Sequence, residues 1–116
     1  MSIGVVHDLP IFEAVSGDAA RAALGRAFGD VRHDVVVYGD THVEAIDEID
    51  KILCVNPGSP TFPHHLELQY DTIGFIEIEH SRPAASIWRI DAGGITPFDW
   101  STWRRPIGSR RREGRR

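Results

Sequence analysis

The sequence predicts an α/β fold in which a mixed β-sheet is flanked by one helix. Two short apolar runs rich in β-branched residues, 3–6 and 35–38, are typical of buried strands. Between them, alanine, leucine and phenylalanine recur at helical spacing over residues 19–28. Beyond residue 40, apolar runs alternate with turn-forming clusters, which indicates further strands.

Each predicted element of the first half ends at a recognisable signal. The first strand ends at His7-Asp8, and Ser16 or Asp18 can cap the helix that follows. That helix should end near residues 29–30, where a glycine allows a left-handed terminus. The second strand is closed by the sequence G-D-T-H at residues 39–42.

The second half predicts two hairpins. Residues 43–46 and 52–55 flank an acidic turn at 47–50, and N-P-G-S-P at 56–60 forms a turn cluster. Residues 72–79 alternate as a strand, with 84–90 as its partner. The side chains expected to be buried there are those of Ile73, Phe75, Ile76, Ile78, Ile87, Trp88 and Ile90. After residues 93–94 the signals for regular structure fade.

Composition limits the classes of protein that the chain can represent. Its 116 residues suffice for one domain, which we place at 1–103, and no apolar run could cross a bilayer. A single cysteine excludes a disulfide framework, and no signal peptide is apparent, so we expect a cytoplasmic protein. Residues 104–116 hold seven arginines and one glutamate, which predicts a disordered tail. That tail is the one segment that could attract nucleic acid by charge.

Three of the predicted strands end in polar motifs, which are the candidate functional residues. Ligands in α/β sheets gather at the carboxyl ends of strands. His7, Asp40 and His42 would offer imidazole nitrogens and a carboxylate oxygen, which suit Zn²⁺, Mn²⁺ or Fe²⁺. The alternative is local: Asp40 and His42 would cap a turn, and His7 would be a hydrogen-bonded histidine at a strand end.

Segments in the middle of the chain resemble the end of calcineurin-like metallophosphoesterases. They are V-V-V-Y-G-D-T-H at 35–42, I-L-C-V-N-P-G-S-P-T-F-P at 52–63 and T-I-G-F-I-E-I at 72–78. V-V-H-D at 5–8 is similar to the site of a lone histidine upstream in that family. The resemblance is to the branch of small bacterial and archaeal phosphodiesterases, which share their fold with a retromer subunit.

The resemblance implies a site for divalent metal, Mn or Zn, which is dinuclear in the family. His7 matches the lone histidine and His42 the second histidine of G-H-x-H, while Asp40 stands where the first histidine belongs. Ser59 of the N-P-G-S motif would be a phosphate contact, although that motif is mainly a backbone turn. No catalytic residue is assigned.

The resemblance also implies that the chain is the C-terminal half of such a domain. The family motifs D-x-H, G-D and G-N-H-[DE] precede the lone histidine, and six residues precede His7. The expected fold is therefore half of a four-layer α-β-β-α sandwich, and the exposed surfaces of a half domain favour a homodimer or pairing with the missing N-terminal half.

Two functions follow from the resemblance. The first is metal-dependent hydrolysis of a small phosphate ester, a phosphodiester, by a metal-activated water. The alternative is a non-catalytic interaction module or a truncated remnant of the same fold. Metal bound in stoichiometric amount would favour the first function over the second.

Overall fold

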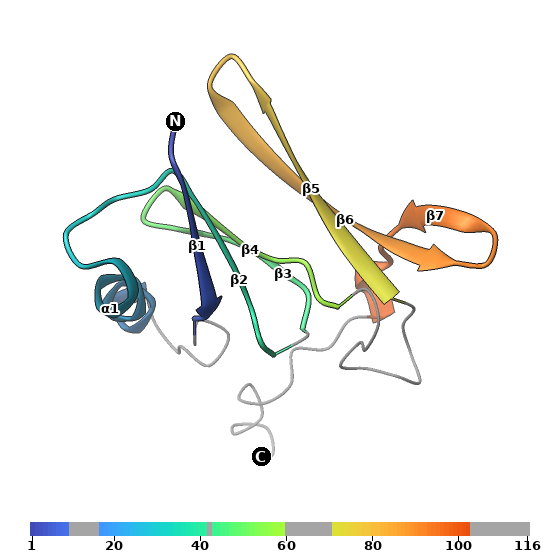
Figure 1. Ribbon diagram of the computed structural model, residues 1–116, viewed down its shortest axis with the longest axis horizontal. Helices are drawn as coiled ribbons and strands as arrows, with labels where there is room; N and C mark the ends of the chain where they lie inside the picture. The colour runs from blue at the N-terminus through green and yellow to red at the C-terminus, as the bar shows by residue number, and fades with distance from the viewer. Residues whose placement is uncertain (10–16, 42, 60–70, 103–116) are drawn as a thin grey trace.

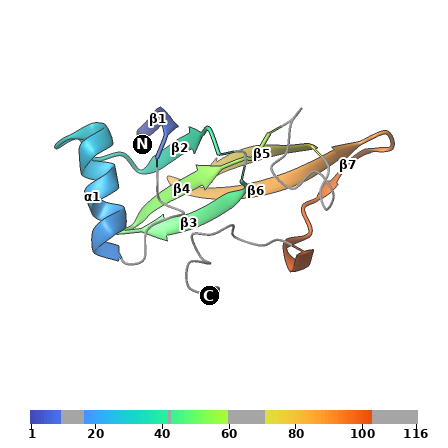
Figure 2. The same ribbon diagram turned by 90° about the horizontal axis from the view of Figure 1, so that it is seen from below.

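The computed structural model describes residues 1–9, 17–41, 43–59 and 71–102, which form one helix and two sheets (Figure 1). The first sheet has the strand order β1-β2-β4-β3, and the second has the order β5-β6-β7. The helix α1 and the strand β7 lie at opposite ends of the molecule in both views (Figures 1 and 2). The predicted α/β class, with a mixed sheet and a flanking helix, is confirmed.

The first sheet brings three strands into parallel alignment. β1 (Ile3–Asp8), β2 (Val35–Gly39) and β4 (Ile52–Asn56) run parallel, because β1 pairs parallel with β2 and β2 pairs parallel with β4. β3 (Ala45–Ile49) forms the antiparallel hairpin with β4. The carboxyl ends of β1, β2 and β4 therefore meet at one edge of the sheet.

The helix α1 (Gly17–Phe28) connects β1 to β2 and covers one face of this sheet. Its buried side, which includes Ala23 and Leu24, joins a core with Val36, Tyr38, Ile52 and Cys54 of the sheet. Helix termination follows the expected mechanism: Gly29 has φ +64°, and its N–H donates to the Gly25 carbonyl at 2.8 Å. Cys54 is fully buried in this core.

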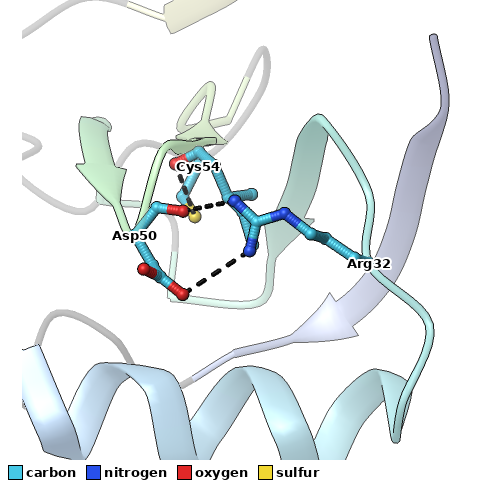
Figure 3. A network of polar contacts seen from close by, with 4 residues as sticks. Arg32, Asp50 and Cys54 are labelled. Carbon is cyan, nitrogen blue, oxygen red and sulfur yellow. Dashed lines mark hydrogen bonds and ion pairs between the residues drawn. The ribbon is translucent and has the colours of Figure 1, made fainter.

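The turn between β3 and β4 is shorter than predicted. It consists of Asp50 and Lys51, with φ values of 55° and 66°, and residues 47–49 of the expected acidic turn belong to β3. Two residues of positive φ match the twist of the flanking strands, which is why a tight turn forms here. Arg32 anchors it by donating to the Asp50 carbonyl and contacting its carboxylate at 3.5 Å (Figure 3).

The second sheet is a meander of β5 (Asp71–Glu79), β6 (Arg82–Asp91) and β7 (Gly94–Pro97). The strand β7 corrects the expectation that structure fades after residue 94. A short 3₁₀ helix, Trp100–Thr102, follows it. Two contacts stabilise this segment despite its weak sequence signals. β7 pairs with β6, and the Phe98 N–H donates to the Ile87 carbonyl at 3.0 Å, with the Phe98 side chain buried.

Several predicted burials are wrong. Ile3 and Val5 lie on the same face of β1, and that face is exposed in the described part of the chain: Ile3 is 45% exposed and Val5 74%. Phe75 and Ile78 of β5 are also exposed, while Ile87 is buried as predicted. Apolar periodicity reports a strand but not which neighbours cover it, and these strands lack cover on one side.

No helix among the described residues is long and apolar enough to cross a membrane. The predicted tail, residues 104–116, lies outside the described residues.

Candidate metal centre

The rim at the carboxyl ends of β1, β2 and β4 brings two predicted ligands together. His7 is the penultimate residue of β1, and Asp40 follows β2, 33 positions later in the sequence. The His7 Nε2 atom lies 2.9 Å from the Asp40 Oδ1 atom. The side chains are 85% and 50% exposed, so both atoms are accessible from solvent.

A β-bulge sets the position of His7. Val5 pairs with Val37, but Asp8 pairs with Gly39, so β1 has one more residue than β2 over this interval. A bulge of this kind turns the side chains beside it relative to a regular strand. The irregularity lies where the imidazole approaches the Asp40 carboxylate.

Asp40 has a backbone conformation that non-glycine residues seldom adopt. Its φ is 74°, and the Thr41 N–H donates across it to the Gly39 carbonyl at 2.9 Å. An i-to-i+2 hydrogen bond around a residue of positive φ describes a rare and strained γ-turn. Strain of this size, about 1–3 kcal/mol, persists only where the surroundings enforce it, and such residues cluster at functional sites.

A buried polar network lies beneath this turn. The Asn56 side chain, fully buried at the end of β4, donates from Nδ2 to the Thr41 hydroxyl at 3.1 Å. Its Oδ1 accepts from the Gly58 N–H at 3.1 Å. The same Thr41 hydroxyl accepts from the Val43 N–H at 3.2 Å. Asn56 therefore joins the loop after β4 to the loop after β2.

A second branch of the network fixes the N-P-G-S turn against the start of β5. The Thr72 hydroxyl donates to the Pro57 carbonyl at 2.8 Å and lies 3.2 Å from Oε2 of Glu44, which is fully buried. Gly58, with φ +81°, passes so close that a Cβ atom there would be 2.2 Å from the Thr72 hydroxyl oxygen. The turn therefore requires glycine for both its φ and its space.

The family model of the calcineurin-like phosphoesterase superfamily domain matches residues 1–81 of the chain. The chain belongs to this superfamily. A probable metallophosphoesterase of Methanocaldococcus jannaschii is 39% identical over 64 residues, which cover 54% of this chain and 31% of that protein. The superfamily membership expected from the sequence motifs is confirmed.

Solved structures of similar fold are retromer-type proteins. Vps29 of Entamoeba histolytica, solved as a complex with Zn²⁺, matches with a TM-score of 0.56 and 21% identity over 81% of this chain and 51% of its own. Vacuolar protein sorting 29 of Cryptosporidium parvum gives a TM-score of 0.56 and 16% identity over 81% and 48%. The chain thus spans about half the length of these two structures. It spans a smaller share, 31%, of the Methanocaldococcus jannaschii metallophosphoesterase.

The structure brings together two of the predicted metal ligands and does not describe the third. His7 and Asp40 are adjacent, whereas His42 lies outside the described residues. Ser59 is 6% exposed, and its carbonyl accepts from the Thr72 N–H at 2.9 Å. That bond gives Ser59 an architectural backbone role, and the phosphate contact of its hydroxyl stays a prediction.

The donor set at the rim suits a divalent metal. An imidazole nitrogen and a carboxylate oxygen are both ligands that Zn²⁺ accepts, and these two atoms lie 2.9 Å apart. Within the described ranges no cluster of three His, Cys, Asp or Glu residues could hold an ion. His7 and Asp40 are therefore two donors of a set that needs more.

Sequence reasoning missed the polar residues behind the rim. Thr41, Glu44 and Thr72 were not singled out, and Asn56 was read only as part of a turn. One signal was available for Glu44, which interrupts the apolar segment 43–46 with a charge. Thr41 and Thr72 carry no comparable signal, because threonine is ordinary in loops and strands.

Proposed function

We propose that this chain contributes His7, Asp40 and His42 to a divalent metal site for the hydrolysis of phosphate esters, with a phosphodiester as substrate. The observation that supports this most is the 2.9 Å approach of an imidazole nitrogen and a carboxylate oxygen at the carboxyl ends of two parallel strands. Membership of the superfamily supplies the expected chemistry, and the donor types suit Mn²⁺ or Zn²⁺.

A divalent ion bound here would polarise a phosphoryl oxygen and lower the pKa of a bound water to supply the nucleophile. The residues of the chain have separate tasks. His7 offers Nε2 from an exposed position that the β-bulge sets, and Asp40 offers an anionic oxygen from a constrained turn. Both groups face solvent, so a phosphate ester could reach them without a conformational opening.

The remaining ligands would come from further polypeptide. Three donors from two loops are too few for two ions, and the chain matches about half the length of the solved structures. We propose that a segment homologous to the unmatched half, or a second copy of this chain, completes the site. The exposed side chains of Ile3 and Val5 at the edge strand β1 support pairing on that side.

A second candidate function is a non-catalytic interaction module. The observation that favours it is that large apolar side chains of β1 and β5 are exposed in the described part of the chain. The exposed apolar side chains of Val5, Phe75 and Ile78 would then serve a protein partner.

Metal content separates the two functions. The chain is incubated with MnCl₂ or ZnCl₂, dialysed, and analysed by inductively coupled plasma mass spectrometry. The metal-site proposal expects bound metal that is lost in His7→Ala and His42→Ala. His80→Asn is the matched control, because it removes a histidine from the β5–β6 turn and asparagine tolerates its φ of 53°. Metal-free wild-type protein would favour the interaction module.

Hydrolysis of bis(p-nitrophenyl) phosphate then tests activity. We expect turnover only when a segment homologous to the unmatched half of the solved structures is supplied in trans, and none with His42→Ala. Activity that survives the loss of both histidines would contradict the proposed site.

A further inference from the structure

The side chain of Asn56 uses both ends of its amide inside the protein. The Gly58 N–H can only donate, so the atom facing it at 3.1 Å is the amide oxygen. The amide nitrogen is thereby directed at the Thr41 hydroxyl, 3.1 Å away. A fully buried amide whose orientation is settled by its partners is a rigid link between two loops.

The Thr41 hydroxyl fixes both sides of position 42 in the sequence. It accepts from Asn56 and from the Val43 N–H at 3.2 Å, which occupies its two lone pairs. The Thr41 backbone in turn closes the γ-turn around Asp40 through its bond to the Gly39 carbonyl. Thr41 therefore links the buried Asn56 side chain to the turn that holds Asp40.

We propose that Asn56 and Thr41 are positioning residues for the metal loop, residues 39–41. Their hydrogen bond would hold Asp40 in its strained conformation, from which its carboxylate meets His7. This inference rests on the proposed metal site. The partners that orient ligands in metal sites commonly change metal affinity about 10–100-fold when they are removed.

Thr72 offers a control that separates positioning of the metal loop from a purely structural role. The Thr72 hydroxyl donates to the Pro57 carbonyl and lies 3.2 Å from Glu44 Oε2 in the same buried region, and neither contact reaches residues 39–43. Replacing Thr72 by valine keeps the shape of the side chain and removes its hydroxyl. It should reduce stability by an amount similar to the loss of the Asn56 amide but leave the metal loop in place.

The test measures Zn²⁺ and Mn²⁺ affinity by competition with a chromogenic chelator. It uses the full chain, together with the complementing half if that half is needed for binding. Asn56→Ala and Thr41→Val should each weaken affinity about 10–100-fold, and the double variant should be no worse than either single variant. Thr41→Ser, which retains the hydroxyl, and Thr72→Val should bind as the wild type does.

Equal affinity of Asn56→Ala, Thr41→Val and wild type would overturn the positioning role while the metal site stands. An equal loss in Thr72→Val would also overturn it, because general destabilisation would then account for the effect.

Hydrogen exchange at the Val43 amide gives a readout that needs no metal. Faster exchange in Asn56→Ala, but not in Thr72→Val, supports the positioning role even if wild-type protein binds no ion and the proposed function fails. Unchanged exchange in Asn56→Ala would overturn the positioning role.

Discussion

Replacing Gly58 by alanine tests the packing behind the rim. The glycine has φ +81°, a conformation that costs an L-residue about 1–2 kcal/mol. A Cβ atom would also lie 2.2 Å from the Thr72 hydroxyl oxygen and 2.8 Å from the Glu44 Oε2 atom, in a buried region. The Thr72 hydroxyl is held by its hydrogen bond to the Pro57 carbonyl, and Glu44 is fully buried, so neither group can move away freely.

The expected loss of stability combines two terms. Overpacking of a well-packed interior costs about 1–3 kcal/mol, which adds to the backbone term of about 1–2 kcal/mol. Gly58→Ala should therefore lower the free energy of unfolding by about 2–5 kcal/mol. Domains of this size have total stabilities of about 5–15 kcal/mol, so the variant would be partly unfolded at 37 °C if the chain is at the lower end.

Urea unfolding followed by tryptophan fluorescence measures this loss. Gly29→Ala is the matched control, because Gly29 also has positive φ, at 64°, but a Cβ there would meet no atom within 4 Å. Gly29→Ala should lower the free energy of unfolding by the backbone term alone, about 1–2 kcal/mol. Adding Thr72→Ala to Gly58→Ala should recover part of the loss by removing the closest clash. An equal cost for Gly58→Ala and Gly29→Ala would refute the packing argument.

Three further predictions concern other parts of the molecule. Gly25→Ala in α1 should raise the free energy of unfolding by about 0.5–1 kcal/mol in the same urea assay, because a Cβ there meets nothing within 4 Å; a loss would show that the position needs glycine. Burial, with a smaller contribution from Asp47, raises the pKa of the Cys54 thiol to about 12 from 9.0. The native thiol should therefore resist Ellman's reagent at pH 8, and stability should fall as pH rises from 9 to 12, because only the unfolded thiol ionises there; rapid native labelling would contradict this. Val5→Lys should reduce self-association in sedimentation velocity runs if the edge of β1 pairs between copies, and an unchanged profile would exclude that edge.

The sequence predicted the elements whose signals are local. Apolar runs bounded by turn residues gave β1, β2 and β4, and alanine spacing gave α1. The convergence of His7 and Asp40 also followed, because parallel strands present their carboxyl ends on one edge. A β-bulge beside His7 could not be predicted, since it depends on the register between two strands.

Burial and buried polar contacts depend on tertiary structure, so the sequence predicted them poorly. Val5 and Phe75 are as apolar as any core residue, yet no described segment covers them. Asn56 looked like one more turn residue, because its partner Thr41 is 15 positions away. The strand β7 contains glycine and proline, which are depleted in strands, and forms because β6 offers it a pairing edge.

Paramagnetic broadening tests the central claim, that the carboxyl ends of β1 and β2 hold a divalent metal, most directly. Substoichiometric Mn²⁺ is added to the ¹⁵N-labelled protein, and the loss of each amide signal is recorded. We predict that the signals of residues 7–8 and 40–43 disappear first, and that His7→Ala protects them. Broadening centred on another acidic segment, such as residues 77–79, or no selective broadening, would contradict the claim.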